Sequence, residues 1–166
     1  AAVYTGEILE TRMSRTGWLV AQAARLIGAP LPVTRDADVP AVVTVTEDEL
    51  GGGQFWTRQY GRHNDFPQVI HSAKRFAGKT GLEEYVGRGI GMALTVDADQ
   101  YALRFRSAFY FVSIAGFRLR LPALLSPGQT TVTHTDLGDG SFAFILELNH
   151  PWLGELIRQT AVFRDG

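Results

Sequence analysis

The sequence contains no cysteine among its 166 residues. The chain therefore has no disulfide framework, no thiolate nucleophile and no cysteine-ligated zinc. It also lacks a surplus of charge of one sign, because 16 Lys and Arg residues stand against 17 Asp and Glu residues. Such a balance offers no overall attraction for the phosphates of nucleic acids, so we expect no nucleic-acid partner.

Long hydrophobic runs are missing as well. The longest apolar run, residues 108–117, is interrupted by Ser113 and Gly116 and is far shorter than the roughly 20 residues of a membrane-spanning helix. We therefore expect no membrane insertion, and together with the lack of cysteine this favours a cytoplasmic protein. The first residue is not Met and no basic-then-apolar leader follows, so we interpret the N-terminus as processed or trimmed.

The chain is rich in aromatic residues, with ten Phe, five Tyr and three Trp. Aromatic residues favour β-strands, and the length fits one domain over residues 1–166. One segment instead has a helical pattern. Ser14 is a typical N-cap and Gly28 with Pro30 predicts the end of the helix. The apolar positions between them are Leu19, Val20, Ala23, Ala24 and Ile27.

Most of the remaining sequence alternates between apolar and polar residues, which is typical of strands. We expect strands at residues 3–11, around Val43 and Val45, and at 54–60, 68–76, 82–87, 92–96, 101–112, 130–135, 141–148 and 156–163. About nine or ten strands in one sheet rarely stay flat. We therefore predict a mainly β (α+β) fold, a strongly curved antiparallel sheet or β-barrel with one main helix, either lipocalin-like or helix-grip-like.

Three short motifs resemble known sites without fitting them. Residues 78–80 (Gly-Lys-Thr) lack the earlier glycine of a phosphate-binding loop, and residues 87–91 (Gly-Arg-Gly-Ile-Gly) are not followed by a helix. We interpret the second motif as a bulge or a tight bend. His134 and Asp136 share one face of a strand, but a metal site needs a third ligand, so we expect a polar hairpin end and no metal.

The most informative segment is residues 56–60, in which alternation places Trp56, Arg58 and Tyr60 on one face. If that face is concave, the arginine lies inside a pocket, where it must pair with an anion or stack. Glu84 is the expected internal partner. A cation-π ladder on the outer surface is the alternative.

Other candidates are less specific. Tyr85, Phe105, Tyr101 and His71 are further candidates for ligand contact, and His71 could also transfer protons. No serine has an adjacent His-Asp pattern, so nothing supports acyl-enzyme chemistry. We expect no cofactor.

The chain resembles an uncharacterised bacterial domain of unknown function, found alone or fused behind saccharopine-dehydrogenase-like reductases. The resemblance rests on an ordered set of motifs. These are Trp56-x-Arg58-x-Tyr60-Gly61, Glu84-Tyr85-x-Gly87, Leu121-Pro122-x-x-Leu125-x-Pro127, Asp139-Gly140-Ser141-Phe142 and Pro151-x-Leu153-Gly154. The chain departs from the family pattern at Tyr60, where phenylalanine is expected, and at Ser141, where arginine is expected. The family's fusions imply service to an oxidoreductase or a biosynthetic pathway.

Our leading hypothesis is a pocket protein for a small, largely apolar metabolite of polyketide or lipid type. Trp56 and Tyr60 would supply a stacking surface, while Arg58 and Glu84 would orient a carbonyl or carboxylate. Such a cavity could also catalyse a cyclisation or isomerisation without a cofactor, by holding a flexible substrate in one conformation. The competing hypothesis is a non-catalytic accessory domain that forms a homodimer or docks onto a reductase.

Overall fold

The computed structural model describes residues 1–26, 28, 31–87 and 89–166. Within them the chain forms eleven strands in one sheet, one α-helix and one 3₁₀ helix. The elements are β1 (Ala2–Met13), α1 (Arg15–Leu26), β2 (Val39–Asp48), β3 (Gly53–Tyr60), β4 (Gln68–Arg75), β5 (Leu82–Gly87), β6 (Ile90–Ala98), β7 (Ala102–Ile114), β8 (Phe117–Arg120), η1 (Ala123–Leu125), β9 (Gln129–Asp136), β10 (Ser141–His150) and β11 (Gly154–Asp165).

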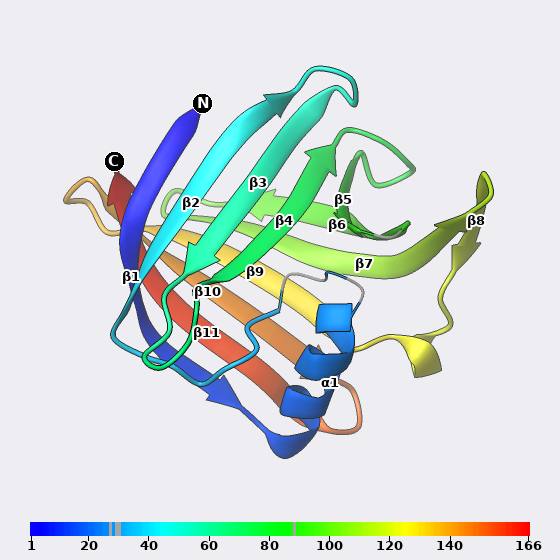
Figure 1. Cartoon of the computed structure of the whole chain (residues 1–166). Coiled ribbons are helices and arrows are strands. Elements are labelled where there is room, and N and C mark those ends of the chain that lie inside the picture. The colour runs from blue at the N-terminus through cyan, green and yellow to red at the C-terminus, as the bar shows by residue number, and fades with distance from the viewer. Residues whose placement is uncertain (27, 29–30, 88) are drawn as a thin grey trace.

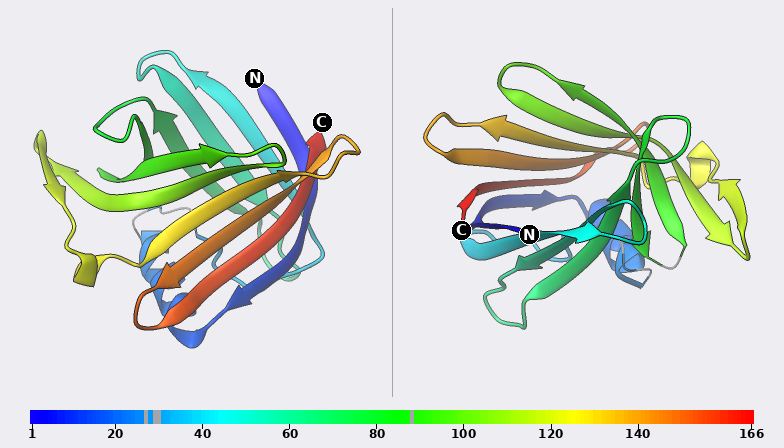
Figure 2. Two further views of the ribbon diagram at one scale, coloured as in Figure 1. Left: turned by 180° about the vertical axis from the view of Figure 1, so that it is seen from behind. Right: turned by 90° about the horizontal axis from the view of Figure 1, so that it is seen from above.

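Ten of the eleven strands close into an antiparallel barrel (Figure 1). Each strand from β1 to β7 pairs with the next, β7 pairs with β9, and β9 to β11 follow in order. The pairing of β11 with β1 completes the ring. Two further views show the strands curling around an interior (Figure 2). The predicted mainly β fold with one main helix is therefore confirmed, in its barrel form.

The fold differs from the sequence prediction at one point. The described residues include a strand that the pattern did not predict, β8, which pairs only with β7 and lies outside the closed ring. The helix covers one end of the closed barrel (Figure 1), so of the two predicted forms the barrel is observed and the half-barrel that grips the helix is not. Closure through β11 and β1 decides between the two forms, because it leaves no open concavity for a helix to enter.

Helix α1 begins where the sequence predicts. The Gly17 N–H donates to Ser14 Oγ at 3.0 Å, and the Ser14 N–H donates to the Leu156 carbonyl at 2.9 Å. A Cβ atom on Gly17 would overlap the Leu156 carbonyl oxygen, so glycine lets the helix lie directly against β11. Gly28 has a φ of +76°, as expected for a residue that ends a helix. The predicted positions Ile27 and Pro30 lie outside the described residues, and so does Arg88.

The interior is apolar where strand alternation turns side chains inward. On β2 these are Val39, Ala41, Val43 and Val45, and on β11 they include Ile157, Ala161 and Phe163. One large core cluster extends from Met13 and the buried face of α1 to Phe144 and Phe163. A smaller cluster surrounds Met92 and Leu94. Within the described part of the chain, no helix has the length and hydrophobicity of a membrane-spanning segment.

Candidate functional site

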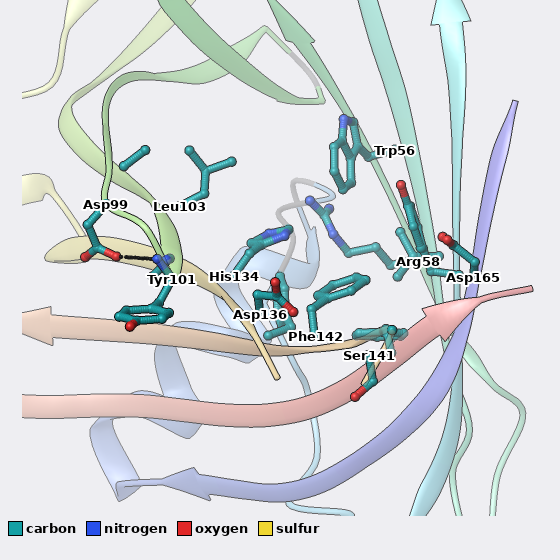
Figure 3. Close-up of a pocket in the computed structure, with 17 residues that line it drawn as sticks. Trp56, Arg58, Asp99, Tyr101, Leu103, His134, Asp136, Ser141, Phe142 and Asp165 are labelled. Atoms are coloured by element: carbon teal, nitrogen blue, oxygen red, sulfur yellow. Dashed lines mark hydrogen bonds between the residues drawn. The ribbon is translucent and has the colours of Figure 1, made fainter. Parts of the chain in front are cut away.

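Two cavities lie inside the barrel, one toward each end. The open-end cavity has a volume of about 560 Å³ and reaches Tyr4 at the start of β1 and Asp165 at the end of β11. Figure 3 is a close-up of this cavity with its lining residues drawn as sticks. The helix-end cavity has a volume of about 400 Å³ and reaches Val20 and Ala24 of α1. The barrel interior is therefore hollow on both sides of its middle.

The walls of the open-end cavity are aromatic and its rim is acidic. The rings are those of Tyr4, Trp56, Tyr101, Phe142, Phe144 and Phe163, together with the imidazole of His134. Asp99, Asp136 and Asp165 lie at the strand ends that form its rim. Figure 3 shows Arg58 extending between Trp56 and His134.

The walls of the helix-end cavity are mostly aliphatic. Its apolar residues include Val86, Met92, Val132, Leu146 and Leu148. Tyr60, Tyr110 and Glu84 bring polar groups to one part of the wall. An apolar cavity with a few converging polar groups is the usual form of a small-molecule site.

Arg58 and Phe144 line both cavities and therefore stand between them. The Arg58 side chain is only 9% exposed. Its position follows from β3, where alternation turns Trp56, Arg58 and Tyr60 inward and pairs them with Ser72, Ile70 and Gln68 of β4. The face that the sequence analysis singled out is thus the interior one.

Glu84 holds the buried polar cluster around Arg58 together. Its Oε1 atom accepts hydrogen bonds from Ser72 Oγ at 2.7 Å and from Arg58 Nη2 at 3.3 Å, and lies 3.4 Å from Lys74 Nζ. Arg58 Nη1 also donates to Ser72 Oγ at 3.1 Å. The pairing of β4 with β5 sets Lys74 directly opposite Glu84. Four neighbouring strand positions thus form one connected cluster.

The cluster carries a net positive charge at neutral pH. Burial opposes ionisation of Glu84, but the charges of Lys74 and Arg58 and the Ser72 hydrogen bond outweigh it and lower the Glu84 pKa to about 2. Burial lowers the pKa of Lys74 to about 8, against the attraction of Glu84. At pH 7 two cations, Arg58 and Lys74, therefore face one carboxylate, which leaves one surplus positive charge inside the barrel.

His134 is a site residue that the sequence analysis assigned to a polar hairpin end and not to a pocket. It stacks on Phe142 with ring centroids 5.6 Å apart and meets Phe144 edge-on at 5.5 Å. Burial and the nearby charges of Lys74 and Arg58 lower its pKa to about 4, so it is neutral at pH 7. The signal in the sequence was alternation with Val132, because both side chains point inward from β9.

Hydrogen-bond donors complete the site. Trp56 Nε1 is buried and has no hydrogen-bond partner among the described residues. The Tyr110 hydroxyl lies 2.6 Å from Thr130 Oγ1. Burial raises the pKa of both Tyr60 and Tyr110, so both keep their protons at neutral pH. The interior therefore offers a cation and neutral donors to an acceptor group.

The other residues selected from the sequence lie in different places. Tyr101 lies at the mouth of the open-end cavity and is 65% exposed. The Phe105 ring packs edge-on against His134, with ring centroids 5.8 Å apart, but is not among the residues that line either cavity. Tyr85 and His71 face the outer surface, where Tyr85 donates to Glu83 Oε2 at 2.7 Å and His71 Nδ1 lies 3.1 Å from Thr57 Oγ1. These two positions lie outside both cavities because their strand neighbours, Glu84 and Ser72, point inward.

The described residues contain no group of three His, Asp or Glu side chains arranged to hold a metal ion. His134 and Asp136 have different surroundings, because His134 packs among aromatic rings while Asp136 lies at the cavity rim. The arrangement can bind, orient and polarise an acceptor group, and it can exclude water from its surroundings.

Comparison with known proteins identifies the family of the chain. No curated protein matches the chain. A crystal structure of a mutant of the fluorescent protein UnaG is similar over 100% of this chain and 95% of its own, with 11% identity and a TM-score of 0.40. A candidate thioesterase II from Thermobifida fusca matches 100% of this chain and 78% of its own, with 9% identity and a TM-score of 0.30. The family model described as "Domain of unknown function (DUF4166)" matches residues 1–163, so the chain belongs to that family.

Proposed function

We propose that the protein binds a small, largely apolar molecule inside the barrel, with the ligand's carbonyl or carboxylate group on Arg58. The observation that carries this proposal is the position of Arg58, which is buried, lines both cavities and belongs to a cluster with one surplus positive charge. A buried charge without a full counter-charge is costly, so an acceptor group that reaches Arg58 gains more there than it would in water.

A pair of fluorescent probes tests this proposal. cis-Parinaric acid and the alcohol derived from it share one polyene chain and differ only at the head group. Titration followed by fluorescence should show tighter binding of the acid. Arg58→Gln should weaken acid binding by about tenfold to a hundredfold, because a hydrogen bond to a charged group contributes roughly 1.5–3 kcal/mol.

The matched control is Arg106→Gln, because Arg106 is exposed on β7 and pairs with Asp97 outside the barrel. It should bind both probes as the wild type does. Equal affinity for acid and alcohol, unchanged in Arg58→Gln, would contradict the proposal.

A catalytic role would use the same geometry. In that version the barrel holds a flexible polyketide-like or lipid-like substrate in one conformation and accelerates a cofactor-free cyclisation or isomerisation. Arg58 and the Tyr60 hydroxyl would polarise a carbonyl, and Glu84 would fix Arg58 in place. Incubation of linear precursors with the wild type and with Arg58→Ala tests this role, and equal turnover would dismiss the assignment of Arg58.

One observation favours the alternative of an accessory domain. The outer edge strand β8 carries exposed Phe117 and Leu119, which are 75% and 61% exposed. An apolar edge of this kind could pair with a second copy or with a reductase. Light scattering on the purified protein separates monomer from dimer. The hollow interior speaks against docking as the main function, because docking needs no internal cation.

A further inference from the structure

The two cavities share one cation but have different walls. Arg58 lines both, whereas the rings of Trp56, His134 and Phe142 line only the open-end cavity. The side chains of Met92, Val132 and Leu146 line only the helix-end cavity. The polar centre of the barrel is therefore placed between an aromatic chamber and an aliphatic chamber.

The charge of the cluster limits how many anions the barrel can take. Arg58 and Lys74 contribute two positive charges and Glu84 contributes one negative charge, so one further negative charge makes the interior neutral. Two acidic ligands, one in each cavity, would leave a buried negative surplus, which is unfavourable. A single ligand with a single anionic group satisfies the interior.

The position of Arg58 also limits where that group lies in the ligand. A fatty acid that places its terminal carboxylate on Arg58 can fill only one chamber, because its chain extends in one direction. A molecule that fills both chambers must carry its acceptor group within its length. The enolate of a β-diketone is such a group, since it is planar and spreads one negative charge over two oxygens that match the fork of a guanidinium.

We infer that the two cavities are the halves of one site for an elongated molecule whose anionic or enolisable acceptor group lies between a planar conjugated part and an aliphatic part. The inference rests on the proposed function and names the ligand class of the same site. The conjugated part lies among the rings of the open-end cavity, where edge-to-face and stacked contacts are available. The aliphatic part lies in the helix-end cavity, where Met92 adapts to its shape.

A series of naphthyl β-diketones, with alkyl arms from methyl to hexyl, tests the inference. Their dissociation constants are measured by fluorescence titration at pH 7. Each added methylene should tighten binding about fourfold until the helix-end cavity is full, because burying one methylene contributes roughly 0.8 kcal/mol. Dialkyl β-diketones of equal length should bind more weakly, because they lack the ring.

Two substitutions assign each half of the probe to its cavity. Val132→Phe narrows the helix-end cavity and should remove the dependence on arm length while the methyl member still binds. The matched control is Thr133→Phe, the neighbouring residue on β9, whose side chain alternates to the outer face. Phe142→Leu should weaken every naphthyl member by the same factor and leave the dialkyl compounds unchanged.

The outcomes separate this inference from the proposed function. Affinity that does not change with arm length in the wild type would overturn the inference, whatever the variants do. Arg58-dependent binding of cis-parinaric acid would then leave the proposed function standing. Failure of both the diketones and parinaric acid to bind would overturn both. If Val132→Phe does not fold, as judged by circular dichroism, the series on the wild type decides alone.

Discussion

The two cavities are built by the same strands and yet differ in chemistry, because residues two apart on one strand face inward about 7 Å apart. Along β10 the inward residues run from Phe142 and Phe144 to Leu146 and Leu148. Strand β9 runs in the opposite direction, with His134 facing the open-end cavity and Val132 the helix-end cavity. The inward side chains of a single strand thus change from aromatic at one end of the barrel to aliphatic at the other.

The rims of the two cavities also differ, because one is acidic and the other is apolar. Asp99, Asp136 and Asp165 surround the open-end cavity, whereas Val20, Leu121 and Leu125 border the helix-end cavity. Carboxylates at a cavity mouth keep it hydrated and repel anions, while apolar side chains favour apolar molecules. The comparison teaches that the two chambers share their polar centre but not their surroundings.

Loss of the shared centre should have the largest effect. Glu84→Gln leaves Arg58 and Lys74 buried without a carboxylate, and breaking a buried ion pair typically costs about 3–5 kcal/mol. The free energy of unfolding, from urea denaturation at pH 7, should fall by that amount. Glu147→Gln, which removes a partly exposed partner of Arg158, is the control and should change stability far less.

The same carboxylate predicts acid sensitivity. The pKa of Glu84 is lowered from 4.5 to about 2 in the fold, so its contribution is fully present above pH 4.5 and is lost as the pH falls toward 2. Glu84→Gln should show a flatter decline in stability over that range. A change of less than 1 kcal/mol at pH 7 would show that the cluster does not stabilise the barrel's centre.

Deprotonation of Lys74 should have the next largest effect on the free energy of unfolding. Lys74 lies next to the aromatic wall of the open-end cavity. The Lys74 ammonium lies 4.2 Å from the ring centroid of Trp56. Burial lowers its pKa from 10.5 to about 8, so the unfolded chain binds more protons between pH 8 and 10.5. The stability of the unliganded protein should therefore rise with pH over that window, and this rise should be absent in Lys74→Met.

Binding should respond to Lys74 in the opposite direction. Above pH 8 the interior loses its surplus positive charge, so an anionic probe should bind more weakly while its alcohol counterpart does not change. An anionic probe whose affinity stays constant from pH 7 to 9.5 would show that Lys74 does not contribute to the electrostatics of the site.

The protonation of His134 reports on the open-end cavity, because this side chain lines only that cavity. Its pKa is lowered from 6.5 to about 4, so the unfolded state binds more protons between those values and stability should fall as the pH drops from 6.5 to 4. An NMR titration should give a midpoint near 4 for His134. His134→Gln should remove this part of the acid sensitivity, and a midpoint near 6.5 would place the ring in water.

The smallest effect is expected at the rim of the open-end cavity. Arg104 pairs with Asp97 and Asp99 on the surface, and such exposed pairs contribute little. Arg104→Gln should leave the midpoint of urea unfolding and the affinity for every probe unchanged. A clear loss of binding would show that the acidic rim needs charge balance to admit a ligand.

Much of the fold could be predicted from the sequence because its signals are local. Ser14 and Gly28 bound the helix, and period-two alternation marks the barrel strands. Strand β8 was not predicted although its four residues, Phe117 to Arg120, alternate between apolar and charged side chains, because so short a run is a weak signal; all four are exposed in the structure. Closure of the ring could only be narrowed to one of two forms, because it depends on pairing between the two ends of the chain.

The candidate site was predictable on β3 and less so elsewhere. Trp56, Arg58 and Tyr60 share one face whichever way it points, so the group could be found before its direction was known. Glu84 and Tyr85 are adjacent and cannot both point inward, and the register of β5 turns Tyr85 outward. The position of His134 inside the barrel could not be predicted, because a single histidine in a threonine-rich strand carries no sign of the rings around it.

The position of β8 outside the ring has a consequence for how this protein can change. The hydrogen-bonded ring of ten strands is complete without β8. The segment formed by β8 and the following turn is therefore an appendage of the barrel and not part of its wall. Leu121 and Leu125, which border the helix-end cavity, belong to this appendage. Changes in the length or sequence of this segment should therefore alter what enters the helix-end cavity while the ten-stranded barrel continues to fold.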